Sequence, residues 1–356
     1  MLAIGLMTRA CMWVARMPVV SSGTGQLGET WVTHPWVETG RTAIDFGIVN
    51  GPRGDLPALG EFVLQVEELG LDGFWVTDHP VWYPDCWITL AAVAGVTKRI
   101  RLGSLVACVP YRNPLVLARM AADIDALSNG RLVVGLGMGD NEDEFKQMGI
   151  ALRSIRERQE MLDETVETLR WLWGDAPAAP ASRHFSVSAE PLKPGPVQRP
   201  RIPILIAGGG ERVTLRQVAE HADASNFGQH DWAGGVRGGE GVQRRLAALR
   251  GWCERLGRPY DSVLKTDVTV PLIIADTRSA VADKLDRYVP PFVRQITTES
   301  IVAGTPGEVI AHYAPLVQAG LQQFLAMVYG SDIETVRLLS ERVVPELRDL
   351  QVSPVA

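Results

Sequence analysis

A histidine and a few carboxylates stand where apolar runs of the sequence give way to loops, and such positions often carry the chemistry of an α/β protein. Asp78 and His79 directly follow the apolar run 73–77. His79 could transfer a proton or hydrogen-bond a ligand ring, while Asp78 fixes its tautomer or binds a ligand hydroxyl. In the structural alternative, Asp78 caps the next turn and His79 packs under a loop with Trp82 and Tyr83. Position alone leaves both interpretations open.

A second group of carboxylates, residues 140–144, follows a run with glycine at positions 135, 137 and 139. The missing side chains would let a ligand approach the backbone there. The acidic run has no nearby histidine and does not match a calcium loop, so we expect no metal and, for most of the run, a solvated loop or helix start. Asp140 is nearest the preceding strand, where partial burial would suit it to act as an acid.

Three successive glycines, Gly208, Gly209 and Gly210, separate the apolar run 203–207 from a helical pattern that opens with Glu211. Backbone N–H groups at the start of a helix suit an anion, so we favour a phosphate site over a plain flexible turn. Nucleophilic catalysis has little support, because Cys108 has no histidine near it in the sequence.

The elements that must position these residues alternate regularly from Ile44 onward, with eight apolar strands each followed by a helical pattern. Strict alternation predicts an all-parallel sheet, and eight units predict a (β/α)8 TIM barrel with insertions after strands 4 and 7, at residues 177–200 and 277–303. A doubly wound sheet is the alternative, but its glycine fingerprint is absent from the first turn, which contains Pro52. In a barrel the strand ends share one face, which brings together Asn50, Asp78, His79, Val106, Asp140, Gly208 and Asn226.

Composition narrows the class of protein. The chain has 356 residues, 46% of them hydrophobic, and 35 basic against 41 acidic residues without a basic run, so nucleic acid is not an expected partner. Four scattered cysteines indicate neither disulfides nor zinc, and no apolar run could span a membrane, so we expect a cytoplasmic protein. Residues 1–43 show neither the helical nor the strand repeat of apolar residues, and we expect them to be a disordered or loosely docked extension. A barrel domain at 44–350 is expected to follow.

Four motifs in order resemble the luciferase-like monooxygenase superfamily, and in particular its coenzyme F420-dependent branch. They are GLDGFWVTDH at 70–79, the stretch 99–140 that contains LGSLVACVPYRNP and GLGMGD, RER at 156–158, and PILIAGGGERVTLRQVAEHADASN at 203–226. The resemblance covers nearly all of residues 44–347. It implies a barrel enzyme that transfers a hydride between coenzyme F420 and a small organic substrate, and such enzymes are often homodimers.

The resemblance also assigns residues. Leu105 and Val106 match a non-proline cis peptide bond that lies against the cofactor ring, and Asp140 matches the catalytic glutamate of a deazaflavin-dependent sugar-phosphate dehydrogenase. His79 and Asp140 are therefore the implied catalytic residues. The implied cofactor-binding residues are Asp78, His79, Leu105, Val106, Gly139, Ala207, Gly208, Gly209, Gly210 and Asn226. The loop after strand 3 is one residue shorter than in that dehydrogenase and no lysine cluster is present, so a sugar phosphate is not the expected substrate.

Three alternatives remain. The first is an FMN-dependent monooxygenase that uses reduced flavin and oxygen. The second is a barrel that carries a cofactor without turnover. The third is a phosphate-binding aldolase or isomerase, which needs a lysine at a strand end, and the candidate, Lys265, stands at the beginning of a strand instead.

Overall fold

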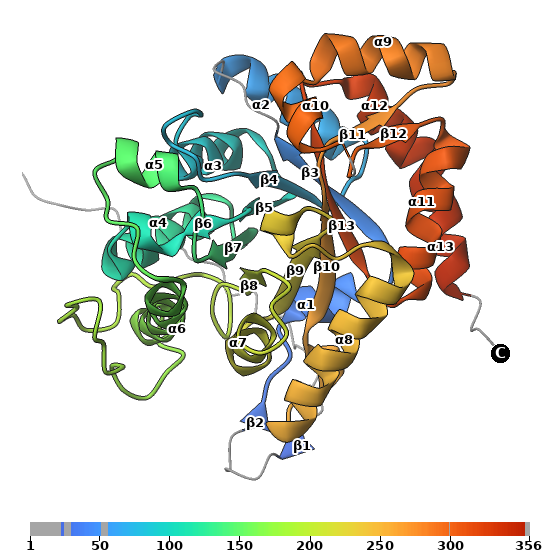
Figure 1. The fold of residues 1–356 in the computed structure, drawn as a ribbon. Helices are drawn as coiled ribbons and strands as arrows, with labels where there is room; N and C mark the ends of the chain where they lie inside the picture. The colour runs from blue at the N-terminus through green and yellow to red at the C-terminus, as the bar shows by residue number, and fades with distance from the viewer. Residues whose placement is uncertain (1–22, 25–29, 51–55, 299, 353–356) are drawn as a thin grey trace, which may run out of the picture.

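One closed sheet of parallel strands forms the centre of the computed structural model, which describes residues 23–24, 30–50, 56–298 and 300–352. Its strands are β3 (Asp45–Asn50), β4 (Gly73–Val76), β5 (Arg101–Ser104), β6 (Ala107–Cys108), β7 (Leu132–Gly137), β8 (Ile204–Ala207), β9 (Ala224–Gly228), β10 (Leu264–Thr269) and β13 (Gln323–Val328). They follow the order β5-β4-β3-β13-β10-β9-β8-β7-β6, and pairing of β5 with β7 closes the ring. Because β5 and β6 together occupy one strand position of the barrel, the predicted eight-stranded barrel is confirmed (Figure 1).

Helices surround this barrel (Figure 1). They are α2 (Leu56–Glu68), α3 (Cys86–Val96), α4 (Pro114–Leu127), α6 (Ile155–Leu172), α7 (Thr214–His221), α8 (Gly238–Arg255), α11 (Pro306–Gln318), α12 (Ile333–Leu338) and α13 (Val344–Val352). α4 shows why such a segment is helical: Asn113 accepts a hydrogen bond from the Leu115 amide at 2.9 Å, and Pro114 occupies the first turn, where no N–H is needed. Within the described residues, no helix is both long and apolar enough to cross a membrane.

The interior of the barrel is filled at its amino end. A Cβ atom at Gly47, Gly73 or Gly103 would lie 2.4, 2.7 or 2.3 Å from the buried Trp75 ring, so three neighbouring strands need glycine to make room for it. The Trp36 ring lies 6.4 Å from the Trp75 ring and is also buried. The amino end is therefore packed with protein, which leaves the carboxyl ends of the strands as the place for a site inside the barrel.

Part of the amino-terminal segment belongs to the barrel, contrary to our expectation for residues 1–43. α1 (Pro35–Gly40) buries Trp36 and Val37, and the His34 ring hydrogen-bonds the Arg201 carbonyl at 3.0 Å. α1 lies at the amino end of the strands (Figure 1). The expectation is wrong for residues 34–43 because two large apolar side chains are enough to dock one short helix. Ahead of it lie the short paired strands β1 (Gly23–Thr24) and β2 (Thr30–Trp31), and residues 1–22 and 25–29 are outside the described residues.

The two insertions differ from each other. Residues 177–200 contain no helix or strand, as predicted. We expected the second insertion to be irregular as well, and that expectation is wrong. It contains α9 (Arg278–Tyr288), α10 (Pro291–Ile296) and β12 (Val302–Gly304). The expected seventh strand ends at Thr269, and its continuation β11 (Leu272–Ile274) leaves the barrel to pair with β12.

Asp45, at the amino end of β3, makes stability depend on pH. Burial and the nearby Asp72 carboxyl raise the pKa of Asp45 to about 6, above its unfolded value. The folded state therefore binds more protons than the unfolded state between about pH 4 and 6, and the stability from this group is lost as the pH rises through 6. We expect Asp45→Asn to stabilise the protein at pH 7.5 by up to about 3 kcal/mol and to change little at pH 4.

Denaturant unfolding of both proteins at the two pH values measures this difference. Asp286→Asn is a matched control, because that carboxylate is 76% exposed. An equal effect of Asp45→Asn at both pH values would contradict the assignment.

Candidate active site

A histidine and a buried glutamate meet at the carboxyl end of the barrel. The His79 Nδ1 atom, in the loop after β4, lies 2.8 Å from Oε2 of Glu144 on the short helix α5 (Glu142–Gln147). The Tyr111 hydroxyl donates a second hydrogen bond to the same oxygen at 2.9 Å. The Glu144 side chain is 0% exposed, whereas that of His79 is 39% exposed. His79 thus faces solvent with an anionic partner behind it.

The protonation of this pair follows from its contacts. Burial acts to raise the pKa of Glu144, but the hydrogen bonds and charge of His79, with the Tyr111 hydroxyl, outweigh it and hold that pKa below its usual value. A carboxylate only accepts hydrogen bonds, so the proton of the neutral imidazole is assigned to Nδ1 and Nε2 is the free acceptor. The arrangement can take up a proton at Nε2 and stabilise the resulting imidazolium.

Local sequence explains how Glu144 comes to be buried. Asn141 caps α5 by accepting a hydrogen bond from the Glu144 amide at 3.0 Å. The next residue, Phe145, is buried and packs its ring 5.2 Å from that of Tyr111. Glu144 and Phe145 form the inward face of α5. We expected most of the run 140–144 to be solvated, and for Glu144 that expectation is wrong. The sequence feature that could have indicated its burial is the aromatic residue beside it on a short capped helix.

Asp78 has a different role from the one we considered for it beside His79. Arg112 donates to both of its carboxylate oxygens, at 2.5 and 2.9 Å, and the Cys108 amide donates at 3.1 Å. Arg112 also binds Asp85 at 2.9 Å. The Asp78 carboxylate therefore binds the loop after β6. Glu144 is the residue that orients His79. Contact between Asp78 and a cofactor stays a prediction.

The strand position shared by β5 and β6 is interrupted at Leu105–Val106. The peptide bond there is cis, as the resemblance implied. The half-buried Val106 packs against β7, because a Cβ at Gly137 would lie 2.6 Å from its Cγ2 atom. A Cβ at Gly135 would lie 2.1 Å from the Ser104 carbonyl oxygen. These glycines make room for the chain itself and not for a ligand, which corrects our expectation for this run.

The residues after β7 are only partly as expected. Gly139 has a φ of 70°, and a Cβ there would lie 2.4 Å from the Cys108 sulfur, while its carbonyl accepts a hydrogen bond from Arg158. Its own contacts are with protein, and contact with a cofactor stays a prediction. Asp140 is exposed, so the partial burial that we expected for it is wrong. Its catalytic role also stays a prediction.

The glycine loop after β8 presents free backbone donors. Gly208 has a φ of 124°, a left-handed conformation that favours glycine, and its amide donates to the Asn226 carbonyl. The amides of Gly209 and Gly210 donate to no acceptor among the described residues. α7 begins at Thr214, so residues 211–213 form a turn where we expected the start of the helix. The loop has the open N–H groups that an anion would use.

Asn226 and Ala207 are in register on neighbouring strands. The Asn226 amide nitrogen donates to the Thr266 hydroxyl at 2.8 Å, and the side chain is buried in the barrel wall. Ala207 is half-buried beside it. The sequence prediction placed both at the mouth, and their contact with a cofactor stays a prediction.

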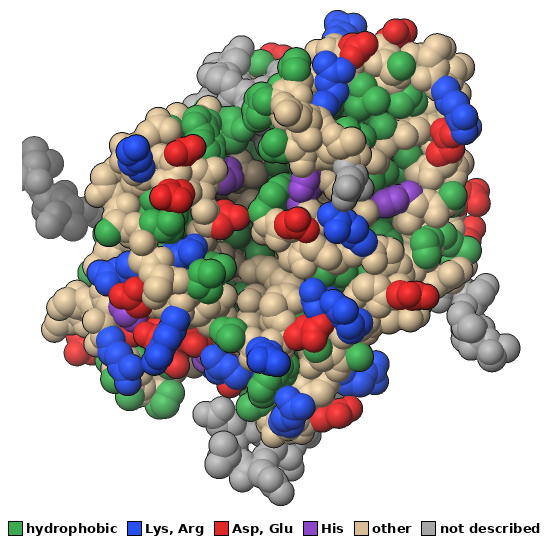
Figure 2. Space-filling view, in the orientation of Figure 1, with side chains coloured by type: hydrophobic (Ala, Val, Ile, Leu, Met, Phe, Trp, Pro, Cys, Tyr) green, Lys and Arg blue, Asp and Glu red, His purple; other side chains and the backbone are tan. Residues whose placement is uncertain are grey.

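A further histidine lies in the loop after β9, and the sequence contained no signal for it. The His230 ring stacks on Trp232 with centroids 4.7 Å apart, and burial lowers its pKa. Its Nε2 atom is buried without a hydrogen-bond partner among the described residues. The same loop packs Gly234 against Gly209. Figure 2 shows the molecule hollowed near the centre of the visible face, with histidine and acidic side chains around the hollow.

One group of possible metal ligands occurs in the described part of the chain, away from the strand ends. Asp163, Glu220 and His221 have ligand atoms within 4.8 Å of one another. The Arg216 guanidinium already donates to both carboxylates of this group. A cation of the protein thus occupies the place that a metal ion would take, and we assign no metal site here.

A parallel eight-stranded barrel with a proton-handling pair at the carboxyl ends of its strands has the architecture of a barrel enzyme. Comparison with known proteins identifies its family. Residues 33–298 match the luciferase-like monooxygenase family, and the chain belongs to that family. The protein is accordingly an oxidoreductase.

Several relatives are similar over most of the chain. An F420-dependent glucose-6-phosphate dehydrogenase of Amycolatopsis mediterranei is 28% identical over 326 residues, covering 84% of this chain and 96% of the relative. The F420-dependent tetrahydromethanopterin reductase of Methanopyrus kandleri superposes with a TM-score of 0.71 at 18% identity, over 86% and 99% of the two chains. A type II Baeyer-Villiger monooxygenase of Pseudomonas putida, in complex with FMN, gives a TM-score of 0.64 at 16% identity, over 85% and 99%.

Proposed function

We propose that the protein transfers a hydride between coenzyme F420 and a small organic substrate at the mouth of the barrel. The observation that carries this proposal is the His79–Glu144 pair, because hydride transfer to a carbonyl, or from an alcohol, needs a group that gives or takes a proton. The relative from Amycolatopsis mediterranei, whose name is that of an F420-dependent dehydrogenase, supports the choice of cofactor.

The residues at the mouth fit such a cofactor. Val106 and Ala207 are half-buried apolar side chains that could support a planar ring. The unpartnered amides of Gly209 and Gly210 suit an anionic phosphate, and the orphaned Nε2 atom of His230 offers a further polar contact. Apolar surface with a few convergent polar groups is the usual composition of a cofactor site.

In the proposed reaction the bound deazaflavin supplies two-electron hydride chemistry at C5. His79 holds or accepts the substrate proton at Nε2. Glu144 keeps the other proton on Nδ1 and stabilises the positive charge that His79 acquires, while the Tyr111 hydroxyl fixes the orientation of Glu144. Asp140 is proposed as the second proton-handling group, on the loop after β7.

The substrate is proposed to lack a phosphate group, unlike that named for the Amycolatopsis mediterranei relative. Two cations that could bind a phosphate are already neutralised. Arg112 binds Asp78 and Asp85, and the Lys284 ammonium, in the second insertion, binds Asp332 at 2.9 Å and the Ile274 carbonyl at 2.8 Å. A substrate phosphate would have to displace these partners. Loss of one partner from a buried ion pair costs about 3–5 kcal/mol.

Titration of the purified protein with coenzyme F420 and with FMN tests the proposal. We expect F420 to bind at least tenfold more tightly, and reduction of bound F420 by candidate alcohols to require His79. His79→Ala should keep cofactor affinity within a few-fold but lose turnover. Tighter binding of FMN would favour the FMN-dependent monooxygenase alternative, which the fold of the Pseudomonas putida neighbour makes the second candidate. Full turnover by His79→Ala would contradict the proposed role of the pair.

A further inference from the structure

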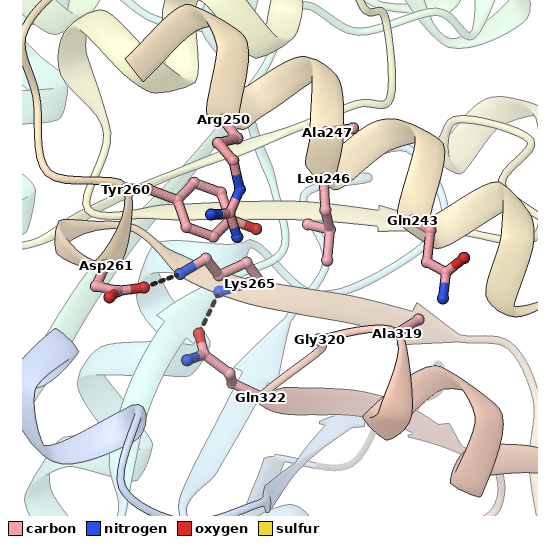
Figure 3. A pocket seen from close by; sticks show the side chains of 10 residues that line it. All are labelled: Gln243, Leu246, Ala247, Arg250, Tyr260, Asp261, Lys265, Ala319, Gly320 and Gln322. Atoms are coloured by element: carbon pink, nitrogen blue, oxygen red, sulfur yellow. Dashed lines mark hydrogen bonds and ion pairs between the residues drawn. The ribbon is translucent and has the colours of Figure 1, made fainter. Parts of the chain in front are cut away.

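A pocket of about 360 Å³ lies at the amino ends of β10 and β13, opposite the strand ends that carry the proposed active site. Figure 3 shows the residues that line it. It opens between α8, the turn Tyr260–Ser262 and the residues that follow α11. Lys265, at the start of β10, points into it in Figure 3, as do Arg250 and Leu246 of α8. The proposed reaction uses the other end of the barrel, so the pocket needs a separate explanation.

Lys265 is a buried cation with weak compensation. Its side chain is 3% exposed, and its Nζ atom lies 4.0 Å from the centre of the Tyr260 ring. Its one ion-pair partner among the described residues is Asp261, at a long 3.5 Å, and that carboxylate is 73% exposed. Because one long ion pair and one ring contact only partly replace the hydration of the ammonium group, burial lowers the pKa of Lys265 to about 8. A bound anion would supply the missing compensation.

Arg250 adds a second cation to the same pocket. Its guanidinium lies 4.3 Å from the centre of the Tyr260 ring, so Arg250 and Lys265 both contact this one aromatic ring (Figure 3). No carboxylate of the described residues pairs with Arg250. Two positive charges and the single negative charge of Asp261 leave one uncompensated positive charge. This balance suits a monoanion.

The rest of the lining is apolar or uncharged. Leu246 and Ala319 line the pocket together with the neutral side chain of Gln243. A ligand that fills the volume can therefore place an apolar part against Leu246 and Ala319 beside its anionic head. We propose that this pocket binds a small organic carboxylate, with its carboxylate at Lys265 and Arg250 and its apolar part against Leu246 and Ala319.

Calorimetric titration of the full chain with benzoate tests the proposal. We expect saturable binding at one site, weakened at least tenfold in Lys265→Met and several-fold in Arg250→Met. Arg255→Met is the matched control, because Arg255 lies on the same helix, packs on Trp252 and does not line the pocket, so it should bind benzoate as the unchanged protein does. His79→Ala should also bind normally, which separates this site from the proposed active site.

Two further measurements strengthen the test. Binding should weaken as the pH rises through about 8, where Lys265 loses its proton; the other charged or titratable groups that act on Lys265 are Asp261, Tyr260, Arg250 and Cys253. Benzyl alcohol, which lacks the charge, should bind at least tenfold more weakly than benzoate. The proposal is overturned if benzoate shows no saturable binding, if Arg250→Met and Lys265→Met bind it unchanged, or if inorganic phosphate binds as tightly.

Discussion

Glu144→Gln is expected to slow hydride transfer by about two to four orders of magnitude, the range that a positioned acid–base group contributes. Glutamine has the same shape and can still accept a hydrogen bond from Nδ1 of His79, so the geometry at the mouth should be kept. It cannot balance the charge of a protonated imidazole, and its amide group can also donate, which allows the wrong tautomer of His79. The loss should appear in kcat, with F420 affinity changed only a few-fold.

Glu142→Gln is the matched control for this experiment, because it makes the same chemical change on α5 at an exposed position. It should leave the rate unchanged. Tyr111→Phe removes one of the two hydrogen bonds that side chains make to the Glu144 carboxylate and should give a smaller loss, of about tenfold. If Glu144→Gln retained the full rate with F420 bound, Glu144 would have only a structural role and the proposed proton path would be wrong.

Gly135→Ala is expected to cause the largest loss of stability among single methyl additions in the barrel wall. The new Cβ would lie 2.1 Å from the Ser104 carbonyl oxygen, which is backbone and cannot rotate away. The Ser104 hydroxyl also exchanges hydrogen bonds with the Gly135 carbonyl and amide, at 2.8 and 3.0 Å, and these would be strained as the strands separate. We expect a loss at the upper end of, or beyond, the roughly 1–3 kcal/mol typical of overpacking.

Thermal unfolding monitored by circular dichroism measures this loss. Gly251→Ala is the control, since a Cβ at this position of α8 meets no atom within 4 Å and alanine favours the helix by about 1 kcal/mol. The control should raise Tm slightly, while Gly135→Ala lowers it by several degrees. Equal Tm values for Gly135→Ala and the unchanged protein would mean that β5 and β7 can move apart at little cost.

The sequence pattern was sufficient to predict the helices and strands that depend on interactions between neighbouring residues. The Asn113 cap and Pro114 predicted the start of α4, and the regular alternation of apolar strands and helices predicted a parallel barrel with a common mouth. Where a short element depended on distant partners, the prediction was wrong. α1 has no long apolar period, yet it docks because Trp36 meets Trp75, which is far along the chain.

The same distinction applies to the candidate site. The class of fold, the strand ends that carry His79, Asp140 and Gly208, and the family resemblance could all be predicted from the sequence, because each depends on residues close together in the chain. The partners of these side chains became known only from the folded chain. Glu144 lies 65 residues from His79, and Arg112 lies 34 residues from Asp78. No local period encodes such pairs, since they form when barrel closure brings separate loops together and buries the Glu144 and Asp78 carboxylates, each of which then needs a partner.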